Sequence, residues 1–156
     1  MARANPVWHE SSAGSPALVV FQGPHGYVSP AWYPSKAEHG KVVPTWNYVM
    51  VQARGPLQVI DDAAWLRRFV TRLTERHEAP RSAPWAVGDA PDDYIEKMLG
   101  AIVGIEIELT ALTGKWKLSQ NRSAADRDGV ARGLDDLDND AARALAQQVR
   151  NPGVEG

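Results

Sequence analysis

The chain has 156 residues, of which 44% are hydrophobic and 23% charged, and this matches one ordinary globular domain rather than a disordered or fibrous chain. It contains no cysteine, which excludes disulfides, thiolate catalysis and cysteine-based zinc sites. The formal net charge of -2 gives no long-range attraction to nucleic-acid phosphates, and no apolar run could cross a bilayer, so we expect a cytoplasmic protein without membrane contact.

The first part of the chain, from about residue 17 to residue 60, is expected to form strands. Ala17 to Gly23 is a short apolar run bounded by prolines, which predicts a strand buried on both faces. A second short strand is expected from His25 to Ser29. The polar stretch from Ser35 to Lys41 predicts a surface loop.

The longest strand candidate runs from Val42 to Arg54 and is rich in Val, Thr, Trp and Tyr. Gly55 and Pro56 predict a turn, followed by a hairpin partner from Leu57 to Ile60. A helix is then expected over about 61–77, because Asp61 and Asp62 are good N-caps and apolar residues follow at helical spacing.

The second half of the chain predicts a second group of strands, at about 101–119, between helices. A helix at about 91–99 opens with Pro91. Apolar and polar residues then alternate from Val103 to Thr110, and a turn at Thr113 and Gly114 leads into Lys115 to Ser119. Helices follow at about 123–136 and 138–149, and 151–156 is expected to be a flexible tail.

Strands in hairpins, with helices inserted and appended, favour an α+β fold with an antiparallel, barrel-like sheet. We expect a single domain over residues 1–150.

Three segments are more specific than ordinary strands and turns: GPHGYVSPAWYPSK from Gly23 to Lys36, KVVPTWNY from Lys41 to Tyr48, and GKWKLSQNR from Gly114 to Arg122. In this order they resemble the PaiB-like family of FMN-binding negative transcriptional regulators, and the resemblance extends from Ala2 to about Gly133.

The resemblance implies a split β-barrel that forms a homodimer and holds FMN at the dimer interface. Relatives carry an additional N-terminal segment with the first barrel strands, so the barrel and the flavin site are expected to be incomplete at the N-terminus of this chain. Gln52 stands where relatives tend to place a histidine.

A flavin needs cations or hydroxyl groups for its phosphate, polar groups for its ribityl chain and pyrimidine edge, and a flat apolar surface for its ring. The expected donors and ring-lining residues lie in the three segments: Ser29, Trp32, Tyr33, Ser35, Lys36, Thr45, Trp46, Asn47, Lys117, Ser119, Gln120 and Arg122. The alternative is that Trp32, Trp46 and Trp116 belong to the barrel core and that the Lys and Arg residues are solvated strand ends.

Other candidates have simpler explanations. His25 suits a general base or a haem ligand, but also a hydrogen-bonded turn. Glu106 and Glu108 share a strand face, which alternation alone explains. The chain has no HExxH, GxSxG, GxGxxG or P-loop motif, so no catalytic residue and no metal ligand is proposed.

The leading prediction is therefore a homodimeric, FMN-binding protein of regulatory type, in which unpaired strand edges are covered by a second copy. Contact with DNA is possible but has no support from the net charge of -2. Arg122, Arg127 and Arg132 do not add support, because their five-residue spacing does not keep them on one helical stripe. Two alternatives stay open: a small flavin-dependent oxidoreductase, and a shortened dimeric remnant without cofactor.

Overall fold

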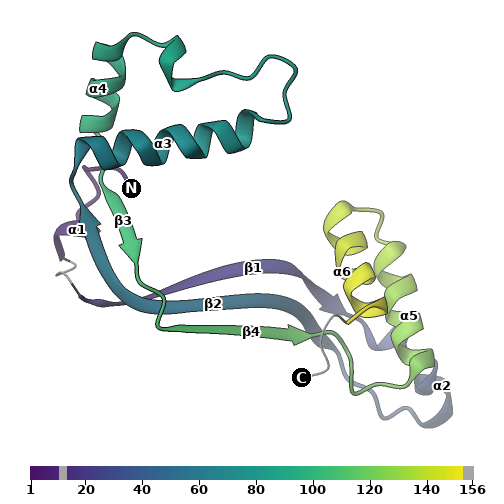
Figure 1. Cartoon of the computed structure of the whole chain (residues 1–156). Helices are drawn as coiled ribbons and strands as arrows, with labels where there is room; N and C mark the ends of the chain where they lie inside the picture. The colour runs from purple at the N-terminus through teal and green to yellow at the C-terminus, as the bar shows by residue number, and fades with distance from the viewer. Residues whose placement is uncertain (11–13, 153–156) are drawn as a thin grey trace. The chain divides into compact units, whose positions relative to one another are not determined.

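A computed structural model of the chain describes residues 1–10 and 14–152 (Figure 1). The helices and strands are, in chain order, α1 (Val7–Glu10), β1 (Pro16–Val28), η1 (Pro30–Trp32), α2 (Ser35–His39), β2 (Thr45–Ile60), α3 (Ala63–Glu78), η2 (Val87–Asp89), α4 (Asp92–Gly100), β3 (Gly104–Ile107), β4 (Ala111–Lys117), α5 (Ala124–Asp135) and α6 (Asp140–Arg150). The four longest helices occupy the segments for which the sequence predicts them. Most of the expected tail lies outside the described residues.

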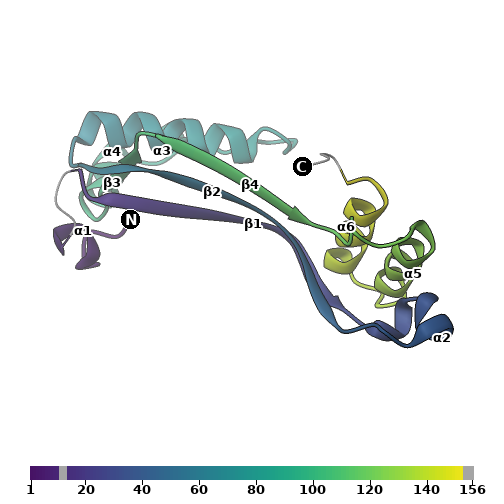
Figure 2. The ribbon, with the colours of Figure 1, turned by 90° about the horizontal axis from the view of Figure 1, so that it is seen from below.

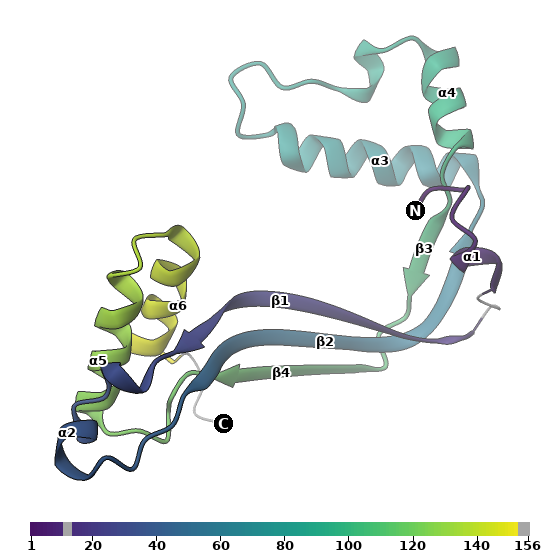
Figure 3. The same ribbon diagram turned by 180° about the vertical axis from the view of Figure 1, so that it is seen from behind.

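The strands form one four-stranded antiparallel sheet, which confirms the α+β class. β2 is the central strand: it pairs with β1, with β3 and with β4. Against β3 its register runs from Leu57 opposite Ile107 to Ile60 opposite Gly104. Figures 1, 2 and 3 show β1, β2 and β4 side by side in every view.

The chain divides into two compact units. Unit 1 consists of Met1–Leu18 and Arg54–Ala111, and unit 2 of Val19–Ala53 and the chain from Leu112 onward. Each unit is built from two separate segments of the chain. The expectation of a single domain stays a prediction.

Two predicted turns are wrong, because glycines that suggest turns serve close packing inside strands. β2 continues without a break through Gly55 and Pro56, where a Cβ atom at Gly55 would lie only 1.8 Å from the carbonyl oxygen of Glu108. β4 runs through Gly114, where a Cβ atom would lie 2.1 Å from the ring of Trp116. Both glycines therefore make room for a neighbour instead of reversing the chain.

Two further expectations for the N-terminal half are corrected. β1 is one continuous strand, and it is not buried on both faces, since Leu18, Val20 and Phe21 are all exposed in the single chain. The predicted loop after Pro34 contains the short helix α2, which Gly40 ends in the left-handed conformation with a φ of 67°.

Unit 1 has a small core beneath α3 and α4. Its buried residues are Leu66, Val87, Ile95 and Leu99. Asp62 caps α3 by accepting a hydrogen bond from the Trp65 amide, as predicted. The N-terminal segment is fastened to the same unit, because the Met1 amino group donates to the Val103 carbonyl at 2.9 Å.

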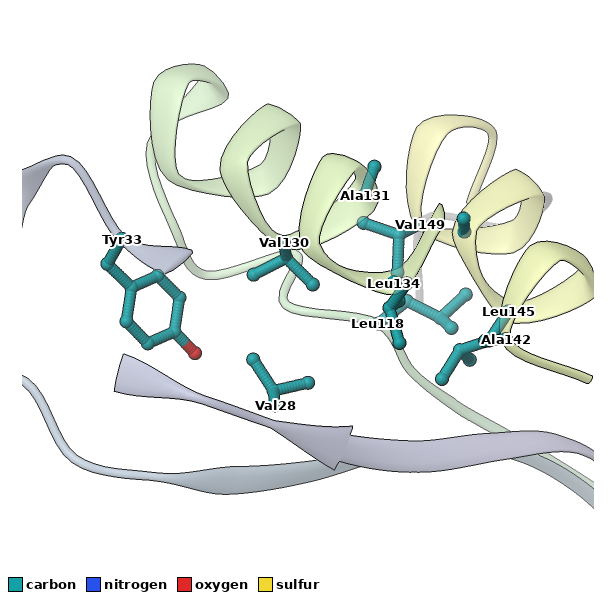
Figure 4. Close-up of a cluster of buried hydrophobic side chains, with 10 residues drawn as sticks. Val28, Tyr33, Leu118, Val130, Ala131, Leu134, Ala142, Leu145 and Val149 are labelled. Atoms are coloured by element: carbon teal, nitrogen blue, oxygen red, sulfur yellow. The ribbon is translucent and has the colours of Figure 1, made fainter. Parts of the chain in front are cut away.

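Unit 2 has a larger core, in which α5 and α6 cover the sheet (Figure 4). Its buried residues are Val28, Tyr33, Leu118, Val130, Ala131, Leu134, Ala142, Leu145, Ala146 and Val149. Among the described residues, no helix is both long and apolar enough to cross a membrane.

Candidate functional site

All twelve predicted site residues belong to unit 2. They separate into a group that holds the unit together and a group that is open to a ligand. The distinction follows from burial and from the partners of each polar atom.

Tyr33 belongs to the first group. Its side chain is 2% exposed and lies in the core cluster, with its hydroxyl near Val28 and Val130 (Figure 4). Among the described residues that hydroxyl has no hydrogen-bond partner. The guanidinium of Arg122 lies over the ring, 4.8 Å from its centroid, so Arg122 covers Tyr33 by a cation–π contact.

Asn47 and Ser119 form a buried polar pair. Asn47 is fully buried and Ser119 is 5% exposed. The Asn47 Nδ2 donates to Ser119 Oγ at 3.0 Å, and the serine hydroxyl returns a bond to Asn47 Oδ1 at 3.3 Å. Ser119 has a positive φ of 62°, which places its hydroxyl on this partner at some cost in backbone strain. The pair joins β2 to the segment after β4.

Ser35 is bound to α5. Its hydroxyl and its amide donate to the two carboxylate oxygens of Asp126, at 2.8 and 3.1 Å. Asp126 is buried, and its own amide donates to the Ser123 hydroxyl at the start of α5. The sequence identifies Asp126 only as a capping residue, and its second role in holding α2 follows from tertiary contacts.

Three more of the predicted residues serve local structure. Ser29 caps η1 by accepting a bond from the Ala31 amide at 3.2 Å. The Gln120 amide bonds to backbone atoms of Leu118 and Trp116 at 2.8 and 2.9 Å. Trp32 packs against α5, as the alternative interpretation expects for a core tryptophan.

The remaining predicted residues are Lys36, Thr45, Trp46 and Lys117. The last three lie at the start of β2 and the end of β4, where Lys117 Nζ donates to Thr45 Oγ1 at 2.8 Å. Trp46 is 48% exposed, so it is not a core residue. Lys36 is exposed on α2.

Trp46 has an exposed aromatic partner. Its indole nitrogen donates to His25 Nδ1 at 3.3 Å, and the two rings stack with centroids 5.8 Å apart. Two residues further along β2, the ammonium group of Lys115 lies over the Tyr48 ring, 6.0 Å from the ring centroid. We call these residues, His25, Thr45, Trp46, Tyr48, Lys115 and Lys117, the Trp46 strip.

Sequence reasoning did not include His25, Tyr48 and Lys115 among the flavin-site residues, although all three lie within the three diagnostic segments. The missing signal was the pairing of β4 with β2, which brings Lys115 to the Tyr48 ring and Lys117 to the Thr45 hydroxyl.

The Trp46 strip offers flat rings, two ammonium groups and a hydroxyl, and it contains no carboxylate. These are the groups that bind a planar, phosphorylated molecule, so the residues present fit FMN in chemical type. A bound ligand of this size buries most of its surface. Since Trp46 is half exposed in one chain, such a ligand would need further cover.

Comparison with known proteins identifies the family of the chain. The family described as "Putative FMN-binding domain" matches residues 1–111. The chain is 41% identical over 147 residues to Uncharacterized protein AN0679 of Emericella nidulans, and 39% identical over 152 residues to Uncharacterized protein AFUA_5G13800 of Aspergillus fumigatus. These matches cover 87% of this chain but only 59% and 58% of the two fungal proteins.

A bacterial relative is matched over more of its length. The chain is 33% identical over 150 residues to Protease synthase and sporulation protein PAI 2 of Bacillus subtilis, which covers 96% of this chain and 70% of that protein. The resemblance seen in the three sequence segments is thereby confirmed, and the chain belongs to the PaiB-like, FMN-binding family.

Proposed function

We propose that this protein binds FMN on the Trp46 strip and acts as a cytoplasmic, regulatory flavoprotein. The observation that carries the proposal is the exposed Trp46–His25 ring pair beside two lysines in a chain of an FMN-binding family. In this arrangement the rings of Trp46 and Tyr48 face the flavin, and the ammonium groups of Lys115 and Lys117 neutralise its phosphate.

The proposal includes a second copy of the chain. Trp46 is half exposed in the single chain, and β1, at the end of the sheet order, exposes Val20, Phe21 and Tyr27. Exposed apolar residues on an edge strand favour pairing with another chain. A two-fold dimer would cover this edge and complete the enclosure of the flavin.

The test of FMN binding is a titration of the purified protein, followed by quenching of flavin fluorescence and by the visible spectrum. Replacing Trp46 by Leu is expected to weaken binding about tenfold, because an aromatic pair contributes about 0.5–1.5 kcal/mol beyond area burial. The matched control is Trp85→Leu, a tryptophan of similar exposure in unit 1. Equal effects of both substitutions would place the flavin elsewhere.

The charge contribution is tested by Lys117→Gln, with Lys97→Gln on α4 as the matched control. Loss of one ammonium group near the phosphate is expected to weaken FMN binding about tenfold, since a hydrogen bond to a charged group contributes about 1.5–3 kcal/mol. The same variant should change riboflavin binding by less than twofold, because riboflavin has no phosphate. An equal loss for both ligands would contradict the assigned position of the phosphate.

The regulatory part of the proposal has one supporting feature, on α3. Arg68, Arg72 and Arg76 are exposed and recur every four residues, so they form one helical stripe. Trp65 and Phe69 stack on the same helix with centroids 5.2 Å apart. A row of exposed cations beside the exposed Phe69 suits contact with DNA phosphates, although the chain as a whole has a net charge of -2.

Binding of a promoter fragment at increasing salt concentration tests this part. Replacing the three arginines by Gln is expected to lower the salt slope by about 2–3, since each phosphate contact contributes about 0.9 to it. The control is Gln at the three arginines of α5 and its N-terminal flank, Arg122, Arg127 and Arg132. DNA binding that does not respond to the α3 substitutions would contradict the role of α3.

The two alternative functions give different results in the same preparations. Oxidation of NADH by the flavin-loaded protein, without sequence-selective DNA binding, would identify an oxidoreductase in which FMN carries the hydride chemistry. A colourless dimer that does not titrate FMN would identify a remnant without cofactor.

A further inference from the structure

A cavity lies in unit 1, between α3, α4 and η2, and has no part in the proposed flavin site. Its volume is about 330 Å³. Its walls include Val70, Val87, Ile95 and Leu99, which belong to or pack against the core cluster of unit 1. The cavity therefore extends the core to the surface, where Trp85 and Met98 form a half-exposed rim.

The segment that carries Trp85 is fastened in place. The Trp85 amide donates to the Glu78 carboxylate at 3.1 Å, and the same carboxylate pairs with Arg81 at 3.0 Å. One residue further on, the Ala86 amide donates to Asp89 Oδ2 at 2.9 Å. Because these bonds fix the backbone on both sides of the indole, the cavity is preformed and does not require a ligand to shape it.

Among the described residues that line this cavity, Arg67 is the one that carries a charge. Its guanidinium pairs with Asp92 at 3.1 Å, and the Asp92 side chain is 86% exposed. Exposed ion pairs contribute little to stability, so an incoming anion can replace Asp92 without a large penalty. A guanidinium fork also binds a carboxylate in two-pronged fashion.

We propose that this cavity binds a small apolar carboxylate, with its ring or hydrocarbon body against the apolar walls and its carboxylate at Arg67. The volume is at the lower end of ligand cavities, about 300–1,000 Å³, and suits a body of one or two rings. A ribityl phosphate would leave its hydroxyl groups without partners against this lining. The ligand class is therefore different from that of the Trp46 strip.

The test uses the full chain with ¹³C-methyl methionine and 1-naphthylacetate as the probe. The chain has three methionines, Met1, Met50 and Met98, and only Met98 lines this cavity. The Met98 methyl signal is expected to move in a saturable titration, while the signals of Met1 and Met50 stay in place. An unmoved Met98 signal would overturn the proposal.

Two pairs of variants locate the ligand. Ala101→Phe fills the cavity from its exposed rim and is expected to abolish the Met98 shift, whereas Ala125→Phe on α5 leaves it unchanged. Arg67→Gln is expected to weaken the binding of 1-naphthylacetate at least fivefold and to change the affinity for the neutral 1-naphthylacetamide by less than twofold. Arg68→Gln, one residue away and outside this lining, changes neither.

Three results would count against the proposal. Equal affinity of the unchanged protein for the acid and the amide would show that the carboxylate is not recognised. A Met98 shift that depends on protein concentration without any probe would identify a second copy as the occupant. A Met98 shift on addition of FMN would assign the cavity to the flavin, whereas FMN binding that leaves Met98 unmoved keeps the two sites independent.

Discussion

The two units reach stability in different ways, although each is built from two separate segments of the chain. Unit 2 buries ten apolar residues in its main cluster and adds the buried polar residues Asn47, Ser119 and Asp126. Unit 1 buries four apolar residues in its main cluster, and a cavity opens directly onto them. In unit 2, a tightly packed apolar core occurs together with buried hydrogen bonds between polar side chains. Unit 1 has a smaller apolar core and a cavity large enough for a ligand.

The largest effect on stability is expected at Gly129 and Gly133 of α5, which have no side chain and so let Trp32 pack closely against the helix. A Cβ atom at Gly129 would lie 2.0 Å from the Trp32 carbonyl oxygen, and one at Gly133 would lie 2.3 Å from the ring. Gly129→Ala should lower the free energy of unfolding by about 3 kcal/mol, because backbone atoms cannot give way easily. Urea denaturation measures this.

The matched substitution in unit 1 is Gly100→Ala at the end of α4, where a Cβ atom would meet nothing within 4 Å. It should be neutral or should stabilise by up to about 1 kcal/mol. Equal losses for Gly129→Ala and Gly100→Ala would mean that the packing of the two units does not differ in this way.

The next effect concerns the buried Asn47–Ser119 pair. Asn47→Ala leaves the Ser119 hydroxyl buried without its partner, which should cost about 2 kcal/mol. The control is Gln58→Ala, an exposed position on the part of β2 that belongs to unit 1, with an expected change below about 0.5 kcal/mol. Thermal unfolding followed by circular dichroism compares the two, and a negligible loss for Asn47→Ala would show that the pair is not needed.

Tyr33 provides a substitution with the opposite sign. Its buried hydroxyl has no partner among the described residues, so Tyr33→Phe should raise the free energy of unfolding by up to about 1 kcal/mol. Guanidinium denaturation in the absence of FMN measures the change. A destabilised variant would reveal a partner for the hydroxyl.

The smallest effect is expected at the surface of unit 1, where Arg3 donates to both carboxylate oxygens of Asp61. The hydrogen bond from Arg3 lowers the pKa of Asp61, and desolvation opposes this only in part. The pair therefore stabilises the folded chain above the unfolded pKa of about 3.9, and this contribution is lost as the pH falls through the lower, folded pKa.

Asp61→Asn should accordingly lower the melting temperature slightly at neutral pH and should have no effect in strong acid. A carboxyl ¹³C titration reports the folded pKa of Asp61 directly. Asp93, exposed on α4, serves as the comparison, and its replacement by Asn should change the melting temperature at neutral pH by less. A normal pKa for Asp61 would contradict the assigned role of Arg3.

Helices and strands differed in how far the sequence could predict them. The helices of both units carry local signals, such as Asp62 and Ser123 at their N-caps, and these depend only on neighbouring residues. Gly55 and Gly114 carry the local signal of a turn, but contacts with Glu108 and Trp116 determine their role. Such contacts depend on strand pairing, which no short window of sequence contains.

The candidate site shows the same limit. The three diagnostic segments identify the family and the part of the chain that carries the candidate site. Both conclusions depend only on the amino-acid sequence of these segments. They do not separate Trp46, which is exposed, from Tyr33, which is core, although both are aromatic residues in the same motifs. That separation depends on where α5 and α6 cover the sheet, and it could only come from the folded chain.

The interleaving of the two units sets the order in which they can form during synthesis. Unit 1 has all of its residues once Ala111 has left the ribosome, whereas eight of the ten core residues of unit 2 lie at or after Leu118. Residues 19–53 are therefore synthesised well before α5 and α6, and the side chains of β1 and β2 stay uncovered until these two helices are made. During translation this interval is the period in which a nascent chain is most exposed to chaperones and to premature association.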